Sequence, residues 1–230
     1  MKMQNPFRTL SKFEWILWLT SLTVVTSTFL FGSQDNILTL IASLIGATAL
    51  IFVAKGAVIG QILTVIFSLF YAYISLQFHY YGEMITYIGM TTPIAIMSVV
   101  TWLKNPYDRQ KSEVKVAKLG HIKTYLMWIL TVSVTFIFFF ILKYFGTANL
   151  VISTISIATS FLASYLMLFR NPFYAIADAA NDVVLIALWI LATMESLSYL
   201  PMIICFVMFL CNDLYGYFNW TRMKKRQSVN

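Results

Sequence analysis

The sequence predicts an all-α polytopic membrane protein whose eight transmembrane helices form two parallel repeats. Three observations lead to this fold class: an apolar composition, a series of long apolar windows, and basic residues confined to alternate connections. Of the 230 residues, 60% are hydrophobic and 11% are charged, whereas a soluble domain carries about a quarter charged residues. A soluble all-α fold is disfavoured because its long apolar helices would have no water-facing sides.

The membrane-spanning helices are predicted from windows of roughly 20 mostly apolar residues, the length that a bilayer requires. Eight windows meet this requirement: 15–32, 37–54, 57–78, 84–103, 125–142, 149–169, 172–194 and 199–221. Most connections between them are too short for a separate domain. The chain therefore divides into 1–103, a cytoplasmic linker with its following helix at 104–148, and 149–230 with a basic tail.

The basic residues predict how these helices are oriented. If residues 1–14 face the cytoplasm and every window crosses once, all of the 16 Lys and Arg residues except Lys143 lie in inside segments. This bias is the positive-inside signal, and it places both termini in the cytoplasm. Asp35, Glu83 and Glu195 are assigned to outside loops. The net charge of +7 then reflects topology and attraction to anionic lipids rather than nucleic-acid binding.

The chain also repeats itself, at an offset of 113 to 118 residues. The tripeptide WIL at 15–17 corresponds to WIL at 128–130, Lys55-Gly56 corresponds to Arg170-Asn171, and Trp102 corresponds to Trp220. An even number of spans in each repeat makes the repeats parallel, and such duplications place a pathway at their seam near the middle of the membrane. Both tryptophans end their windows, so we expect them in the interfacial aromatic belt.

Two local features refine this picture. Pro93 lies inside the window 84–103, where it removes a backbone donor and predicts a kink. The segment 104–123 is polar and basic, and it is predicted to be a solvated linker that is helical in part.

Polar side chains inside the last two windows predict a binding site. A carboxylate at membrane depth costs at least a few kcal/mol, so Asp178, Asp182 and Asp213 should face a water-filled cavity or a partner. The further candidates on these helices are Asn181, Trp189, Asn212 and Tyr215. Carboxylates, carboxamides and aromatic rings together suit a small polar ligand with a flat ring, and the rings also attract a cation. Asn212 and Asp213 remain open to a second interpretation, as interhelical hydrogen bonds.

Catalytic and metal-binding patterns are absent from the sequence. No Ser/His/Asp arrangement and no Gly-rich phosphate loop is readable, and His79 and His121 are isolated. Cys205 and Cys211 lie six residues apart in one window and face different directions, so neither a disulfide framework nor a zinc site follows. The sequence predicts neither an enzyme nor a cofactor.

Three stretches carry a resemblance to a known family. RNPFYAIADAANDVVLIALWILA (170–192) and SYLPMIICFVMFLCNDLYGYFNWTRMKKRQ (198–227) resemble the last two helices of the PnuC family of vitamin-precursor transporters. HYYGEMITYIGMTTPIAIMSVVTWLKNPY (79–107) resembles the end of the first repeat in members from Gram-positive bacteria. The chain departs from many members at Tyr174 and Ala177, where they carry a Trp pair.

The resemblance implies a fold related to SWEET sugar transporters, with two parallel three-helix bundles, a linker helix and an extra N-terminal helix. It further implies a homotrimer in the bacterial cell membrane that takes up nicotinamide riboside by facilitated diffusion, after which a cytoplasmic kinase traps the substrate. Carried over by position, the ligand contacts are Asn181, Trp189, Asn212 and Tyr215, with Tyr71 as the counterpart of Trp189 in the first repeat.

Three alternatives remain beside this function. Related family members carry thiamine or riboflavin, so the substrate could be another vitamin. A proton-coupled carrier would use Asp178, Asp182 or Asp213 as a relay. A membrane sensor that binds the vitamin without transporting it is the least favoured, because the sequence contains no appended signalling domain.

Overall fold

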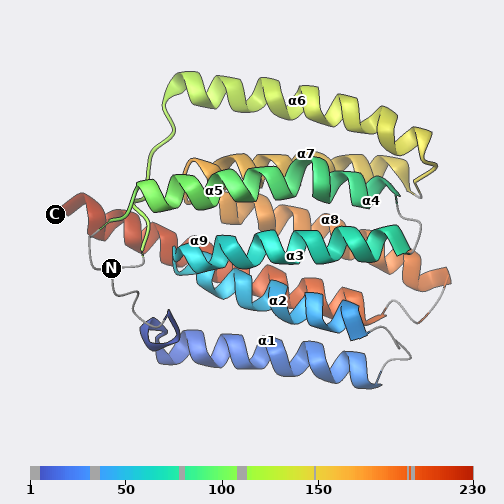
Figure 1. Ribbon diagram of the computed structural model, residues 1–230, viewed down its shortest axis with the longest axis horizontal. Coiled ribbons are helices and arrows are strands. Elements are labelled where there is room, and N and C mark those ends of the chain that lie inside the picture. The colour runs from blue at the N-terminus through green and yellow to red at the C-terminus, as the bar shows by residue number, and fades with distance from the viewer. Residues whose placement is uncertain are drawn as a thin grey trace.

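The computed structural model describes residues 6–31, 37–77, 81–107, 113–147, 149–195, 197 and 200–229, and it is all-helical apart from two isolated β-bridges in this part of the chain. Eight of the helical segments described are long and apolar enough to cross a membrane. They lie side by side along the long axis of the molecule, with α1 and α6 at opposite edges (Figure 1). The prediction of eight spans is confirmed.

The helices follow the predicted windows closely. They are α1 (Lys12–Phe31), α2 (Ile37–Ala54), α3 (Val58–Gln77), α4 (Tyr81–Thr86), α5 (Thr92–Lys104), α6 (His121–Tyr144), α7 (Leu150–Leu168), α8 (Tyr174–Glu195) and α9 (Leu200–Val229). A short 3₁₀ helix, η1 (Pro6–Thr9), precedes α1, and a π-helical segment, η2 (Tyr87–Thr91), joins α4 to α5 within one span.

The π-helical segment lies directly before Pro93, where the sequence predicts a kink. Proline has no backbone N–H and clashes with the preceding turn, and a π-turn is one way in which a helix absorbs such a defect. The wider turn of η2 carries Tyr87 and Thr91. Both residues line the cavity described below.

The helices pack as two groups of three spans. One group consists of α2, α3 and the α4–η2–α5 span, and the other of α7, α8 and α9. The groups meet where α2 contacts α9 and where α5 contacts α7. Helix α1 packs on α2 and α9, whereas α6 packs on α7 at the other edge.

We call one end of the bundle the linker end, because the segment 113–120 lies there, together with the turns after α2 and α7 (Figure 1). The two turns have the same geometry. The N–H of Gly56 donates to Val53 O at 2.8 Å, and the N–H of Arg170 donates to Met167 O at 2.9 Å. Gly56 and Arg170 have φ angles of 70° and 58°, as in Schellman motifs that close α-helices.

The predicted linker 104–123 is helical at its two ends, where α5 ends and α6 begins, whereas the segment 113–120 is not helical, and 108–112 lie outside the described residues. Instead, the segment 113–120 runs across the linker end and connects the two turns. The N–H of Val114 donates to Gly56 O at 2.9 Å, and the N–H of Ala117 donates to Arg170 O at 3.0 Å. These bonds use backbone groups that a helix would have satisfied internally.

Trp102 and Trp220 are both 0% exposed, so the prediction that they belong to an interfacial belt is wrong. Their rings contact each other at a centroid distance of 5.4 Å. Trp102 Nε1 donates to Met167 O at 3.2 Å, and Trp220 Nε1 donates to Val53 O at 2.9 Å. Each indole is thus bonded to the helix end of the other group, which gives it a buried partner that an interface position does not require.

Helix α1 begins with a capping box, in which Ser11 and Glu14 exchange hydrogen bonds between side chain and backbone. The Glu14 side chain, 1% exposed, also accepts hydrogen bonds from Lys55 Nζ at 2.9 Å and from the Tyr215 hydroxyl at 2.7 Å. Through this network the start of α1 is fixed to α9 and to the turn after α2.

Candidate functional site

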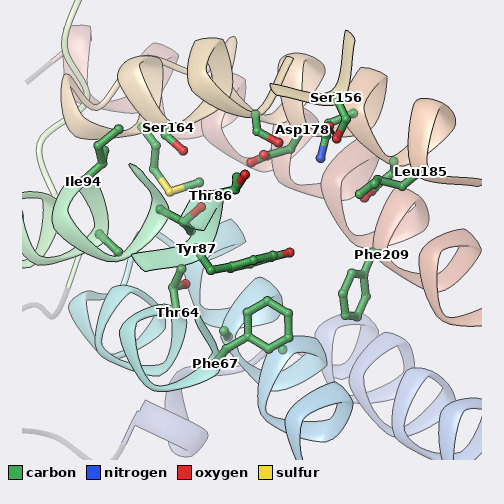
Figure 2. A pocket seen from close by; sticks show the side chains of 18 of the residues that line it. Thr64, Phe67, Thr86, Tyr87, Ile94, Ser156, Ser164, Asp178, Leu185 and Phe209 are labelled. Atoms are coloured by element: carbon green, nitrogen blue, oxygen red, sulfur yellow. Dashed lines mark hydrogen bonds between the residues drawn. The ribbon is translucent and has the colours of Figure 1, made fainter. Parts of the chain in front are cut away.

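A cavity of about 170 Å³ lies between the two groups of helices. Its wall comes from α2, α3, the α4–η2–α5 span, α6, α7, α8 and α9. Figure 2 shows polar side chains from opposite sides pointing into this space, among them Thr64, Ser164 and Asp178. Buried polar groups cost free energy unless they are satisfied. Helix packing by itself therefore does not explain why so many polar side chains line a cavity inside this apolar bundle.

One wall of the cavity is a row of hydroxyl groups. Ser156, Ser160 and Ser164 recur every four residues and therefore share one face of α7. The opposite wall adds hydroxyls from α3, α4, η2 and α5: Thr64, Thr86, Thr91 and Ser98. A hydroxyl both donates and accepts hydrogen bonds, so these walls suit a ligand rich in hydroxyl groups.

The carboxamide of Asn181 is held in place by α7. Its Oδ1 accepts hydrogen bonds from Ser156 Oγ at 3.0 Å and from Thr159 Oγ1 at 2.8 Å. Because the carbonyl oxygen is used in this way, the amide group presents its N–H₂ on the other side. Asn181 thereby adds an oriented donor to the cavity wall.

Four carboxyl groups line the cavity, namely Glu83 on α4, Asp178 and Asp182 on α8, and Asp213 on α9. The carboxyl groups of Asp182 and Asp213 lie within hydrogen-bonding reach of each other, and Asp178 lies near both. A hydrogen bond between two carboxyl groups requires a proton on one of them. None of the described residues that line the cavity is Lys, Arg or His.

Two buried atoms in this wall have no hydrogen-bond partner in the part of the chain that the structure describes. They are Asp182 Oδ2 and Gln61 Oε1, on side chains that are 5% and 0% exposed. The other end of the Gln61 amide, Nε2, donates only to the sulfur of Met167, a weak acceptor. Buried polar groups of this kind are rare and call for an explanation.

Aromatic rings complete the cavity. The ring of Tyr87 extends across the space between Phe67 and Asp178, and Phe209 lies at one end (Figure 2). Phe67 and Tyr87 are in edge-to-face contact at 6.2 Å. Flat faces of this kind stack on a planar ligand ring, and their π-electrons also attract a cation.

The structure brings three of the seven predicted site residues together. Asn181, Asp182 and Asp213 line the cavity. Trp189 and Tyr71 are not among the lining residues: Trp189 packs against the apolar cluster that includes Phe206 and Phe209, and the ring of Tyr71 contacts that of Tyr87 at a centroid distance of 4.6 Å.

The other two predicted residues point to α1 in this structure. Asn212 Nδ2 donates to Ser21 Oγ at 3.0 Å and to Met208 O at 2.8 Å, and Tyr215 donates to Glu14. This is the interhelical bonding that the sequence left open for Asn212. Substrate contact by Asn212 and Tyr215 stays a prediction.

Sequence reasoning missed several residues of the cavity. Glu83 was assigned to an outside loop, but it lies in α4 and lines the cavity. Gln61 and the serines of α7 were not singled out, because single Ser, Thr and Gln residues are common in membrane helices. The four-residue spacing of Ser156, Ser160 and Ser164 was a signal that could have found them.

A helical membrane bundle with a central cavity lined by polar and aromatic side chains is typical of small-molecule transporters. The chain matches the family model described as nicotinamide mononucleotide transporter over residues 36–222. It belongs to this family, and hence to a family of transporters rather than enzymes.

Individual relatives agree with this assignment. The chain is 29% identical to the nicotinamide riboside transporter PnuC of Neisseria mucosa, over 93% of this chain and 82% of that protein. It is 24% identical to the nicotinamide riboside transporter PnuC of Haemophilus influenzae, over 92% and 91%. A crystal structure of the vitamin B3 transporter PnuC superposes with a TM-score of 0.79 at 28% identity, covering 95% of this chain and 94% of that one.

Proposed function

We propose that this protein carries nicotinamide riboside into a bacterial cell by facilitated diffusion. The observation that carries the proposal is the central cavity, which combines hydroxyl groups for a ribose with aromatic faces for a pyridine ring. The substrate named for its relatives in Neisseria and Haemophilus is nicotinamide riboside. After entry, a cytoplasmic kinase phosphorylates the substrate and thereby prevents its return.

Within the cavity, Asn181, Asp182 and Asp213 contact the substrate. The ring stacks against Tyr87 and Phe67, which are supported by Tyr71. Trp189 supports the opposite aromatic wall through Phe206 and Phe209. Asn212 and Tyr215 lie on other faces of α9 than Asp213, because each helical residue is turned by about 100° from the one before it. They would reach the substrate only if α9 rotated about its axis during transport.

The two groups of spans are parallel repeats, each of three spans, with α6 as the linker helix and α1 as the extra helix. Matching turns and matching tryptophan side chains support this arrangement. The turns after α2 and α7 match in hydrogen bonds and backbone angles at an offset of 114 residues, and Trp102 and Trp220 make reciprocal bonds to the opposite group. Substrate then crosses by rocking of one group against the other around the cavity.

The linker end faces the cytoplasm, and so do both termini. The described basic residues Lys55, Lys104, Lys115, Lys118 and Arg170 all lie in turns or at helix ends there, which agrees with the positive-inside rule. The protein assembles as a homotrimer, for which the exposed apolar side chains of α6, such as Val132, Phe136 and Phe140, provide a surface.

Uptake of labelled nicotinamide riboside into proteoliposomes tests this function. We expect uptake that saturates, stops at the equilibrium level without a kinase inside, and continues inward when a nicotinamide riboside kinase and ATP are enclosed. Thiamine and riboflavin are added as competitors. Absence of both binding and uptake of nicotinamide riboside would overturn the proposed substrate.

A proton-coupled carrier is the second candidate, and the close pair Asp182–Asp213 favours it. Intramembrane carboxyl groups of this kind act as proton relays in other transporters. An imposed pH gradient distinguishes the two mechanisms: facilitated diffusion predicts no accumulation above the equilibrium level in kinase-free vesicles, whereas coupling predicts accumulation that a protonophore removes.

A further inference from the structure

We infer that the four carboxyl groups of the cavity recognise the positive charge of the substrate ring, so that the protein selects a cationic heterocycle over a neutral one of the same shape. This inference rests on the proposed function, and it goes further by assigning separate roles to the carboxyl and hydroxyl groups. The hydroxyl walls bind the sugar, while Glu83, Asp178, Asp182 and Asp213 provide a negative environment for the ring.

Carboxyl groups inside and outside the cavity differ in their partners. Glu14 is paired with Lys55, and Glu113 is paired with Arg226. The four cavity carboxyl groups form no ion pair with any residue that the structure describes, and no basic side chain among these residues lines the cavity. Carboxyl groups buried without a counter-charge take up protons, whereas a cation bound among them favours their ionised form, so the four groups and a cationic ring stabilise each other.

An unpartnered buried atom of Asp182 points to a ligand. Asp182 is 5% exposed and lines the cavity, yet its Oδ2 has no hydrogen-bond partner within the described chain. Its carboxyl group also lies within hydrogen-bonding reach of Asp213. A buried acceptor in this state is costly for the fold, and a cation beside it supplies the missing interaction.

Tyr87 places the ring near these carboxyl groups. Tyr87 is within electrostatic range of both Glu83 and Asp182, and its ring extends into the cavity between Phe67 and Asp178 (Figure 2). A planar cation stacked on Tyr87 would therefore lie near carboxyl groups from both α4 and α8. Cation–π attraction acts in the same direction as these charges.

The hydroxyl groups of the cavity disfavour the simplest alternative, in which the carboxyl groups serve only as acceptors for sugar hydroxyls. Ser156, Ser160 and Ser164 on α7 already provide donors and acceptors for a sugar, as do the hydroxyls of the opposite wall. Apart from the aromatic rings, a positive charge has no other partner among the described lining residues. The cavity therefore fits nicotinamide riboside, a pyridinium, and it also fits the thiazolium of thiamine, whereas riboflavin is neutral.

The test compares nicotinamide riboside with dihydronicotinamide riboside, which keeps the sugar and the carboxamide but has no charge on the ring. Affinities are measured by calorimetry on the purified protein in detergent. We expect the wild-type protein to bind the cation at least tenfold more tightly, and Asp182→Asn and Asp213→Asn to remove most of this preference by weakening only the cation. Equal binding of both ligands by the wild-type protein, or equal losses in the variants, would overturn the inference.

Two control variants make the result specific. Glu113→Gln removes a carboxylate outside the cavity and should leave the preference unchanged. Ser164→Ala removes a cavity hydroxyl and should weaken both ligands by the same factor. Thermal unfolding of each variant, followed by circular dichroism, identifies any that fails to fold.

The failure of the proposed function gives a different result from failure of the inference. If neither riboside binds, nicotinamide riboside is not the substrate, and the charge comparison is repeated with thiamine and its neutral oxidation product thiochrome. A tenfold preference for thiamine then supports the inference without the proposed substrate. Binding of riboflavin in place of either cation, or binding of neither cation, overturns it.

Discussion

The central cavity and the linker end of the bundle both bury carboxyl groups, but these groups differ in their partners: Glu14 at the linker end is paired with Lys55, whereas the four carboxyl groups of the cavity form no ion pair with a described residue. At the linker end, Glu14 accepts hydrogen bonds from Lys55, Tyr215 and Ser11, and the indoles of Trp102 and Trp220 donate to backbone carbonyl groups. In the cavity, Asp182 and Gln61 each keep a buried oxygen without a partner in the described chain. Since a satisfied buried group stabilises and an unsatisfied one costs free energy, we expect the paired groups of the linker end to stabilise the fold and the unpaired carboxyl groups of the cavity to act in ligand binding.

Among the variants that test this comparison, Trp220→Ala is expected to lower the free energy of unfolding the most. It removes a side chain that is 0% exposed and contacts Trp102 and Tyr174, so we expect a loss of about 3–5 kcal/mol in the free energy of unfolding. Chemical denaturation in detergent measures it. Trp128→Ala on α6, where the side chain is 55% exposed, is the matched control and should cost far less. Equal losses in the two variants would contradict a structural role for the Trp pair.

The next test breaks the ion pair at the start of α1. In Lys55→Met, the buried carboxylate of Glu14 loses its cation but keeps its bonds from Ser11 and Tyr215. We expect a loss of about 1–3 kcal/mol, the range for a hydrogen bond to a charged group. The double variant Glu14→Gln/Lys55→Met should recover part of this loss, and the double-mutant cycle gives the coupling energy. A coupling energy of zero would show that the pair contributes nothing.

Much of the fold could be predicted from the sequence, because the membrane-spanning helices begin and end close to the ends of the apolar windows. Helix α2 spans the predicted 37–54, and α3 (Val58–Gln77) lies within one residue of the predicted 57–78 at each end. The three carboxylates that interrupt the last windows, Asp178, Asp182 and Asp213, do lie on the cavity wall. Membrane depth makes such residues conspicuous, since few of them are tolerated there.

The sequence could not decide which face of a helix meets the cavity. Asn212 and Asp213 are adjacent, so they point about 100° apart; Asp213 lines the cavity and Asn212 bonds to Ser21 on α1. Trp102 and Trp220 were misplaced for a related reason. A tryptophan at the end of a span is typical of the membrane interface. Only the packing of segments that are distant in the sequence shows that these two contact each other.

A smaller effect is expected for Asn212→Ala. It removes the hydrogen bond to Ser21 between α9 and α1, and we expect a loss of about 1 kcal/mol in the free energy of unfolding. Ser21→Ala should give a similar loss, because it removes the same bond from the other side. Affinity for nicotinamide riboside, measured by calorimetry, should stay within about threefold in both variants. Loss of binding in Asn212→Ala with unchanged stability would instead place Asn212 in the substrate site, as the sequence predicts.

The smallest effect on stability is expected for Asp182→Asn, although Asp182 is as deeply buried as many core residues. Its carboxyl group is unsatisfied at Oδ2 and lies beside Asp178 and Asp213, so replacing it with a neutral amide of the same shape removes a cost rather than a contact. We expect a change within about 0.5 kcal/mol or a gain in the free energy of unfolding, together with weaker binding of the cation. The same denaturation experiment on Glu14→Gln provides the contrast, because that carboxylate has its partners and its loss should destabilise the protein. If Asp182→Asn costs as much as Glu14→Gln, the carboxyl groups of the cavity stabilise the fold in the same way as those of the linker end, and burial without a partner no longer distinguishes the two regions.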